Sequence, residues 1–219
     1  MKIAILYMAF VAFGATIVLH AASRKVDFSD DAVGQSPKGF EFGHTAKAGA
    51  PGKWIVEAEG TNKYLAQVDA DNTRARFPVA VVSDISAADI DLSVRFRPIS
   101  GRVDQAAGLV WRYRDQDNYY IVRANALEDN VVLYKVEKGT RTDLPVKGEG
   151  RTYGKKTEVP AKQWSTLRVV ANGRLFEVYF NGTKLYDVED STFTQPGRIG
   201  VWTKADSVTQ FDDLTIVTK

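Results

Sequence analysis

Strict alternation of apolar and polar residues, interrupted at short intervals by turn formers, is the feature that most constrains this chain. The clearest case is Asp89–Arg97, DIDLSVRFR, where four apolar residues alternate with polar ones. Period-two alternation gives a strand one dry face and one polar face. Pro98 follows directly and predicts the end of this strand, because proline cannot donate the next ladder hydrogen bond.

The same pattern recurs along the chain, and no long segment shows a sustained helical period. The other segments predicted as strands are Trp54–Ala58, Tyr64–Val68, Ala75–Phe77, Ala107–Arg114, Tyr119–Asn125, Val131–Glu137, Trp164–Ala171, Leu175–Phe180, Thr183–Tyr186, Gly197–Lys204 and Gln210–Val217. Asn172-Gly173 and Asn181-Gly182 predict tight hairpins, since Asn-Gly favours turns with positive φ. The Gly-rich Gly148–Pro160 predicts a long loop or a protruding hairpin. A dozen or so short strands predict an all-β fold, and the length favours a two-sheet antiparallel jelly-roll sandwich over one immunoglobulin-type domain of about 100 residues.

The first residues have the layout of a secretory signal peptide. Met1-Lys2 supplies a positive start, Ile3–Leu19 is an almost unbroken apolar run, and the small residues Ala21-Ala22-Ser23 follow. We therefore expect residues 1–23 to be a signal peptide, cleaved after Ala22 or Ser23. The alternative is a retained membrane anchor, because the apolar run is near the ~17-residue lower limit for spanning a bilayer. Cleavage would leave residues 24–219 as a single β-sandwich domain, periplasmic or secreted and without a membrane segment.

Composition narrows the function classes. The chain has no cysteine, and a secreted protein without cysteine fits a bacterial periplasm or exterior better than a disulfide-rich secretory product. Its net charge is only +2 with no long basic tract, which argues against nucleic-acid binding. The sole histidines are His20 and His44, so neither a histidine-rich metal site nor a Ser-His-Asp triad is predicted.

Polar and aromatic residues alternate on the predicted central meander, Gly108–Tyr134. Tyr119, Ile121, Arg123 and Asn125 share one face of their strand by period two, and the residues between them, Tyr120, Val122 and Ala124, share the other, which we expect to be core. Arg112 stands between Trp111 and Tyr113 and is expected to point away from both. If Arg112 lies beside Arg123 and Asn125, the three form a row of planar donors next to an aromatic ring, as in sugar-binding surfaces. The alternative is that the arginines pair with acidic residues of neighbouring strands.

The order of motifs resembles a known superfamily. GLVWRYRDQDNYYIVRA is followed by NVVLY, WSTLRV, the Asn181-Gly182 turn and GRIGVWTKADSVTQFDDLTIV. Over Val26–Val217 this is similar to the concanavalin A-like lectin/glucanase jelly rolls, and closest to bacterial secreted laminin-G-like and 3-keto-disaccharide hydrolase-like domains. The resemblance implies a curved sheet packed on a flatter one, with ligands on the concave face or its rim loops. Retaining glucanases of this superfamily carry Glu-x-Asp-x-x-Glu, which is absent here.

The resemblance and the residues together predict a lectin-like domain that binds a glycan without catalysis and needs no cofactor. The alternatives are a glycoside hydrolase or lyase acting on 3-keto-disaccharides, and a protein–protein adhesion module of the laminin-G type. The predicted ligand-binding residues are Arg112, Tyr119, Arg123, Asn125 and Trp202. For Trp202 and Lys204 the expected roles are a stacking platform and a rim contact, with a core position for the tryptophan as the alternative.

Many jelly rolls of the superfamily hold a calcium ion that joins their terminal strands. The resemblance therefore implies a structural Ca²⁺ at Asp212 or Asp213, with further oxygen ligands from the Asp27–Asp31 region. The alternative is that one aspartate is solvated and the other pairs with a lysine or arginine.

Overall fold

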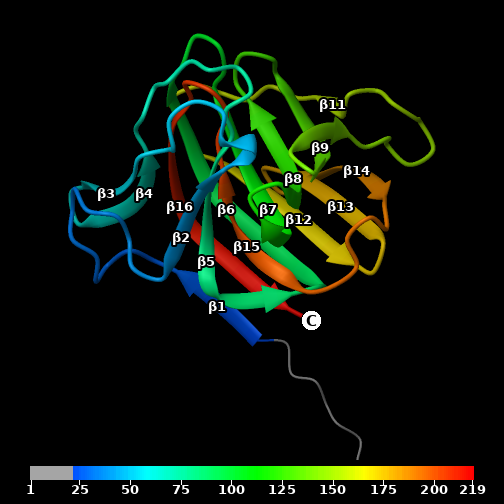
Figure 1. The fold of residues 1–219 in the computed structure, drawn as a ribbon, viewed down its shortest axis with the longest axis horizontal. Helices are drawn as coiled ribbons and strands as arrows, with labels where there is room; N and C mark the ends of the chain where they lie inside the picture. The colour runs from blue at the N-terminus through cyan, green and yellow to red at the C-terminus, as the bar shows by residue number, and fades with distance from the viewer. Residues whose placement is uncertain (1–21) are drawn as a thin grey trace, which may run out of the picture.

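The computed structural model describes residues 22–219, which form two antiparallel β-sheets (Figure 1). The first sheet contains the strands at both ends of this range. Its strands, in spatial order, are β14 (Thr183–Glu189), β13 (Leu175–Phe180), β12 (Ser165–Asn172), β6 (Ile90–Ser100), β16 (Val208–Thr218), β4 (Asn62–Gln67) and β3 (Trp54–Glu59), with β1 (Ala22–Val26) paired to β16. The blue β1 therefore lies along the red β16 in Figure 1, so the first and last described strands are neighbours.

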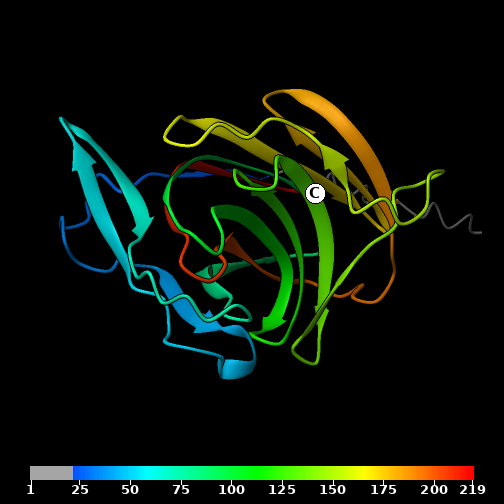
Figure 2. The same ribbon diagram turned by 90° about the horizontal axis from the view of Figure 1, so that it is seen from above.

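The second sheet carries the central meander that the sequence predicts. In spatial order it contains β10 (Thr140–Asp143), β9 (Asn130–Glu137), β8 (Asn118–Asn125), β7 (Ala106–Asp115), β15 (Gly197–Trp202), β5 (Pro78–Ala87) and β2 (Phe40–His44), with β11 (Lys155–Lys156) paired to β9. The green strands of this sheet curve strongly in the view from above (Figure 2). One short 3₁₀ turn, η1 (Thr45–Lys47), is the sole helical element of the described residues. The predicted all-β, two-sheet antiparallel jelly-roll sandwich is confirmed.

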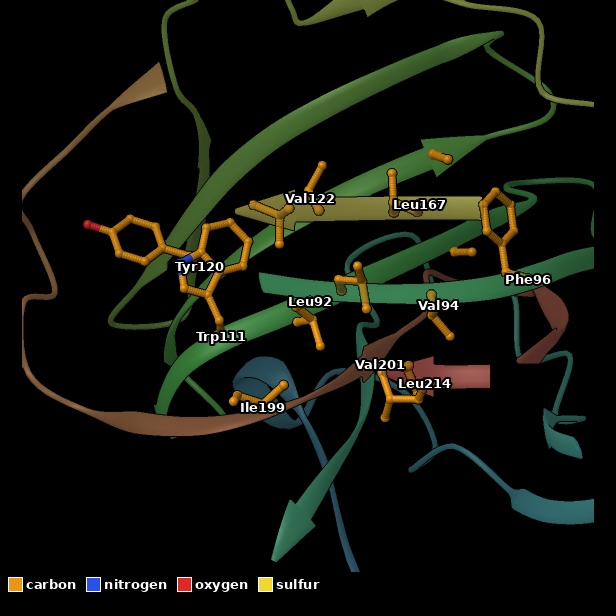
Figure 3. Close-up of a cluster of buried hydrophobic side chains, with 14 of the residues drawn as sticks. Leu92, Val94, Phe96, Trp111, Tyr120, Val122, Leu167, Ile199, Val201 and Leu214 are labelled. Atoms are coloured by element: carbon orange, nitrogen blue, oxygen red, sulfur yellow. The ribbon is translucent and has the colours of Figure 1, made fainter. Parts of the chain in front are cut away.

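The core lies between the two sheets, where the alternating residues of both meet (Figure 3). Leu92 of β6 and Leu167 of β12 come from the first sheet, and both are fully buried. Trp111 and Tyr120 oppose them from the second sheet, with ring centroids 5.4 Å apart in a stacked arrangement. Phe176 of β13 meets Trp111 edge-on at 5.3 Å. Burial of these large side chains is the main stabilisation of the sandwich, at roughly 25 cal/mol per Å² of apolar surface.

Strand boundaries differ from expectation in several places: the predicted strand Ala75–Phe77 lies outside any strand, β5 begins after it at Pro78, and a proline fails to end β6. Pro98 does not end its strand, because β6 continues to Ser100. On one side of β6, the pairing with β12 already stops at Phe96, opposite Ser165. The backbone of Pro98 therefore has no strand beyond it on that side, and the missing N–H breaks no ladder there.

The predicted hairpins form at both Asn-Gly sites. Asn181 and Gly182 link β13 to β14, and both have positive φ (46° and 81°), as the sequence predicts. The earlier hairpin is shifted by one residue. Asn172 still pairs with Leu175, so the central turn residues are Gly173 and Arg174, and Gly173 (φ 55°) supplies the left-handed conformation.

The Gly148–Pro160 segment folds back onto the second sheet, where Lys155 and Lys156 pair with β9. The predicted signal peptide lies outside the described residues, apart from its junction at Ala22 and Ser23, which begin β1. Within residues 22–219, no helix has the length and apolarity that crossing a bilayer requires.

Candidate functional site

The outer face of the second sheet, which points away from the first sheet, carries most of the predicted ligand-binding row. Tyr119 and Ile121 belong to an apolar cluster on this face, whereas Tyr120 and Val122 belong to the core between the sheets. Arg123 pairs in register with Val132, another member of the outer cluster. The predicted division of β8 into two faces is therefore confirmed.

Arg112 does not lie on this outer face, and the expectation that it does was wrong. A bulge interrupts the β7–β8 register after Trp111, and Arg112 takes a left-handed backbone conformation with φ 47°. Its guanidinium, only 1% exposed, donates to the carbonyl oxygens of Phe193 and Gly173, at 2.6 Å each, and of Ala88, at 2.9 Å. Arg112 thus joins three loop carbonyl groups from distant parts of the chain, which is a structural role.

Tyr119 and Trp202 form the floor of the outer face instead of its surface. Both are fully buried. The indole N–H of Trp202 donates to the Tyr119 hydroxyl at 3.1 Å, and that hydroxyl lies 2.6 Å from Thr45 Oγ1. Phe77 stacks on the Trp202 ring at 5.3 Å. Burial raises the pKa of Tyr119, so its hydroxyl stays protonated and its role here is packing.

Arg123 is fully buried and is the centre of a polar network. Its guanidinium donates to both carboxylate oxygens of Glu128, at 3.2 and 2.9 Å, and to Asn130 Oδ1 at 2.5 Å. Its charge lies 5.6 Å from the ring centroid of Tyr134 and 5.8 Å from that of Tyr153. Burial alone would raise the pKa of Glu128, but the hydrogen bonds and charge of Arg123 outweigh it, so the pKa lies below its usual value.

Asn125, next to this network on β8, binds a buried carboxylate, Asp104. Its amide donates to Asp104 Oδ1 at 2.5 Å, and its own oxygen accepts from the backbone N–H of Leu127 at 2.9 Å. Asp104 also forms an ion pair with Lys204. Burial raises the pKa of Asp104 even though Lys204 opposes the shift. The Lys204 side chain is 16% exposed, and its rim contact with a ligand stays a prediction.

A pocket opens beside this network, and we call it the Tyr153 pocket. Its volume is about 400 Å³, and it is lined by Leu127, Glu128, Asn130, Thr152, Tyr153 and Lys156. Tyr153 and Leu127 are 44% and 49% exposed, unusual for such large apolar side chains. Glu128 is its sole carboxylate. The pocket therefore combines an exposed aromatic face with amide, carboxylate and ammonium groups, the mixture found in ligand sites.

A larger hollow of about 630 Å³ lies at the other end of β8. Its walls include Asp115 and Asp117, whose carboxylates already accept hydrogen bonds from backbone N–H groups: Asp117 N to Asp115 at 2.8 Å, and Ala46 N to Asp117 at 2.6 Å. None of the predicted ligand-binding residues lines either hollow, but Glu128 and Asn130 of the Tyr153 pocket bind the predicted Arg123 directly. We therefore take the Tyr153 pocket as the candidate site.

The predicted calcium ligands do not fit the ion. Asp212 accepts a hydrogen bond from the Asn62 amide at 3.0 Å, and Asp213 pairs with Lys25 at 2.7 Å and Arg95 at 3.2 Å. No cluster of three or more His, Cys, Asp or Glu residues suited to a metal occurs among residues 22–219. Calcium needs six to eight oxygens, whereas two cations already neutralise Asp213. The lysine of β1 thus makes the terminal-strand link that the resemblance assigned to a metal.

Several residues of the pocket escaped sequence reasoning. Glu128 and Asn130 read as a polar turn between strands, and Tyr153 lies in the Gly-rich segment interpreted as a loop. The available signal was a tyrosine in a strongly polar, glycine-rich stretch. Its significance depends on Gly154, where an added Cβ would lie 2.1 Å from the Val131 carbonyl oxygen. That close approach docks the loop onto β9 and brings Tyr153 over the network.

The fold is shared with solved structures of other proteins. A carbohydrate-binding module, CBM66 from Bacillus subtilis, superposes with a TM-score of 0.61 at 22% identity, covering 81% of this chain and 94% of that one. Domain 4 of AbnA, a GH43 extracellular arabinanase from Geobacillus stearothermophilus solved with arabinotriose, gives a TM-score of 0.58 at 14% identity, covering 90% and 93%. Comparison with curated protein sequences finds no match.

Sequence similarity to one protein family covers most of the sandwich. Residues 37–217 match the family described as the 3-keto-alpha-glucoside-1,2-lyase-like domain. This range runs from just before β2 to the penultimate residue of β16, and so contains the Tyr153 pocket and the whole polar network. The chain therefore belongs to the 3-keto-alpha-glucoside-1,2-lyase-like family, whose fold is that of the concanavalin A-like jelly rolls.

Proposed function

We propose that the protein binds a carbohydrate in the Tyr153 pocket. The observation that carries this proposal is the exposed Tyr153 ring beside the Arg123–Glu128–Asn130 network. Sugars present C–H faces that pack on aromatic rings and hydroxyl groups that exchange hydrogen bonds with carboxylates and amides. The Tyr153 pocket offers both kinds of contact. The shared fold with CBM66 and the arabinanase domain supports this proposal.

The backbone around Tyr153 supports a binding role. Tyr153 has a left-handed conformation (φ 58°), which costs a non-glycine residue about 1–2 kcal/mol. Its hydroxyl accepts a hydrogen bond from Tyr134 at 2.9 Å, and its ring meets that of Tyr134 edge-on at 6.0 Å. The loop therefore holds an exposed aromatic ring in one orientation, as a sugar platform requires.

The test is binding of a glycan panel to wild type and to Tyr153→Ala. We expect the variant to bind at least about tenfold more weakly, because it loses the stacking surface, and to lose some thermal stability, because buried Tyr134 loses its hydrogen-bond acceptor. Phe42→Ala is the matched control, since Phe42 is 42% exposed and lines the larger hollow. Loss of binding in Phe42→Ala alone would place the site in that hollow and overturn the proposal.

A second candidate is the lyase activity that the family description names. The observation that favours it is Glu128, the single carboxylate of the pocket, kept ionised by Arg123. In a 1,2-elimination from a 3-keto-glucoside, a base takes the C2 proton, which the neighbouring ketone acidifies. The C1–C2 double bond then forms as the C1–O bond breaks, and the leaving oxygen takes up a proton. We hypothesise that Glu128 is this base.

Incubation with a 3-keto-disaccharide separates the two candidates. Elimination would release the second sugar and an unsaturated ketone that absorbs in the ultraviolet, and Glu128→Gln would abolish both while the fold persists by circular dichroism. Binding without turnover would leave the non-catalytic role. Secretion and signal cleavage stay predictions, which N-terminal sequencing of the exported protein would test. The adhesion role also stays a prediction.

A further inference from the structure

Arg141 of β10 lies across a group of aromatic rings on the outer face of the second sheet. It pairs in register with Val136, a member of the outer apolar cluster, and so points to that face. Its guanidinium carbon lies 4.4 Å from the ring centroid of Tyr134, 4.8 Å from that of Phe77 and 5.7 Å from that of Trp202. Three rings therefore support one cation, which fixes its position without neutralising it.

The other arginines of this region have carboxylate partners. Arg123 pairs with Glu128 at 2.9 Å, and Arg76 pairs with Asp69 at 2.7 Å. No ion pair joins Arg141 to an acidic residue of the described part of the chain. The carboxylate of its own strand, Asp143, pairs with Arg151 at 3.0 Å instead.

The guanidinium also has an unmet hydrogen-bonding capacity. Its Nη1 atom is buried and has no hydrogen-bond partner within residues 22–219. Contacts with ring faces use the flat side of a guanidinium, whereas its N–H donors point outward in its plane. A buried donor without an acceptor is unfavourable. Arg141 as a whole is only partly buried, so other atoms of its side chain are exposed although Nη1 is buried.

Arg141 and the Tyr153 pocket meet at one side chain. Tyr134, the ring closest to Arg141, donates a hydrogen bond to the Tyr153 hydroxyl at 2.9 Å. Arg141 itself does not line the Tyr153 pocket, so a ligand packed on Tyr153 would have to extend past Tyr134 to reach this cation. The planar guanidinium of arginine binds carboxylates and phosphates through two parallel hydrogen bonds.

We propose that the protein prefers acidic carbohydrates, with one sugar ring on Tyr153 and a uronic-acid carboxylate on Arg141. This inference rests on the proposed function, because it assigns the ligand class of the same site. Arg141 is then the residue that determines specificity, and the Tyr153 pocket provides affinity for acidic and neutral sugars alike.

The test uses a matched pair of ligands, oligogalacturonides and the same oligosaccharides after carboxyl reduction, in calorimetric titrations. Wild type should bind the acidic member about 10- to 100-fold more tightly, as loss of a charge-assisted bidentate pair predicts. Arg141→Gln should remove this difference and leave affinity for the neutral member unchanged. Arg141→Lys should restore part of it, because the charge remains but the fork is lost. Arg174→Gln, 73% exposed in a turn of the first sheet, controls for net charge.

The outcomes separate the inference from the function on which it rests. Equal affinity of wild type for the two ligands, or a preference that survives Arg141→Gln, would overturn the inference and leave carbohydrate binding intact. If Arg174→Gln also loses the preference for the acidic ligand, that preference comes from net charge alone, and the inference is overturned. Binding of neither ligand, nor of any member of the glycan panel, would overturn both. Thermal unfolding of Arg141→Gln close to wild type shows that the lost preference is not misfolding.

Discussion

Glu128→Gln isolates the energetic role of the buried charge at the centre of the site. Arg123 is 0% exposed, and Glu128, its one ion-pair partner among residues 22–219, is 34% exposed. Removing one partner of a fully buried pair costs about 3–5 kcal/mol, because the other charge stays buried without compensation. Here Glu128 is partly solvated, and Asn130 still accepts from Arg123 at 2.5 Å. We therefore expect a loss of about 2 kcal/mol in the free energy of unfolding.

Urea denaturation of the two proteins measures this loss, and thermal unfolding gives a second reading. For a domain of this size, about 2 kcal/mol corresponds to a fall in Tm of roughly 4–8 °C. Glu149→Gln is the matched control. Glu149 is 47% exposed in its pair with Lys155, and such surface pairs contribute about 0–1 kcal/mol.

The pH dependence provides an independent check. The pKa of Glu128 is lowered in the folded state, so its stabilisation is fully present above the unfolded value of 4.5 and is lost as the pH falls through the folded pKa. The difference between wild type and Glu128→Gln should therefore be constant near neutral pH and shrink in acid. A difference below about 0.5 kcal/mol at pH 7, or one that persists unchanged in acid, would refute the assignment of a buried charge held by Glu128.

Three further predictions concern the frame around the site. Trp202→Phe should cost about 2 kcal/mol in urea denaturation, because Tyr119 loses a donor and a cavity forms, and an unchanged midpoint would show that Trp202 is not floor packing. Gly200→Ala should cost about 3 kcal/mol or prevent folding, because its Cβ would lie 2.1 Å from the Ala80 carbonyl oxygen; a stable variant in thermal unfolding would contradict this packing. Calcium and a chelator should leave Tm unchanged, whereas Asp213→Asn should lower stability by up to about 1 kcal/mol by losing the Lys25 and Arg95 pairs. A calcium-dependent rise in Tm would reinstate the metal.

The candidate site was only partly predictable, and particular residues show why. Arg123 and Asn125 were identified because period-two alternation places them on one face of β8, and that rule depends on the chain alone. Arg112 was placed on the wrong face because a bulge, with a left-handed residue, changes the alternation after Trp111. No local pattern marked that bulge. It is stabilised by carbonyl groups of Ala88, Phe193 and Gly173, which lie far away in the sequence.

Pro98 and Asp213 illustrate the same limit. A proline ends a strand only when a neighbouring strand needs its missing N–H as a hydrogen-bond donor. At Pro98 no such strand is present on the β12 side, because the pairing of β6 with β12 ends at Phe96. By its chemistry the carboxylate of Asp213 could bind either a metal ion or a basic side chain. The choice was made by Lys25 on β1, which reaches it only because the first and last described strands pair.

The sequence by itself determined the all-β class, the two faces of β8 and the hairpins, because alternation and turn formation are local properties of the backbone. The tertiary structure alone decided which polar residues meet. Tyr153 reaches Tyr134 through a loop that docks at Gly154. Arg141 on β10 contacts Phe77, just before β5, and Trp202 on β15, and both are far from it in the sequence. Burial, charge pairing and unmet hydrogen bonds depend on those long-range contacts, so the chemistry of the site was settled by packing and not by the order of residues along the chain.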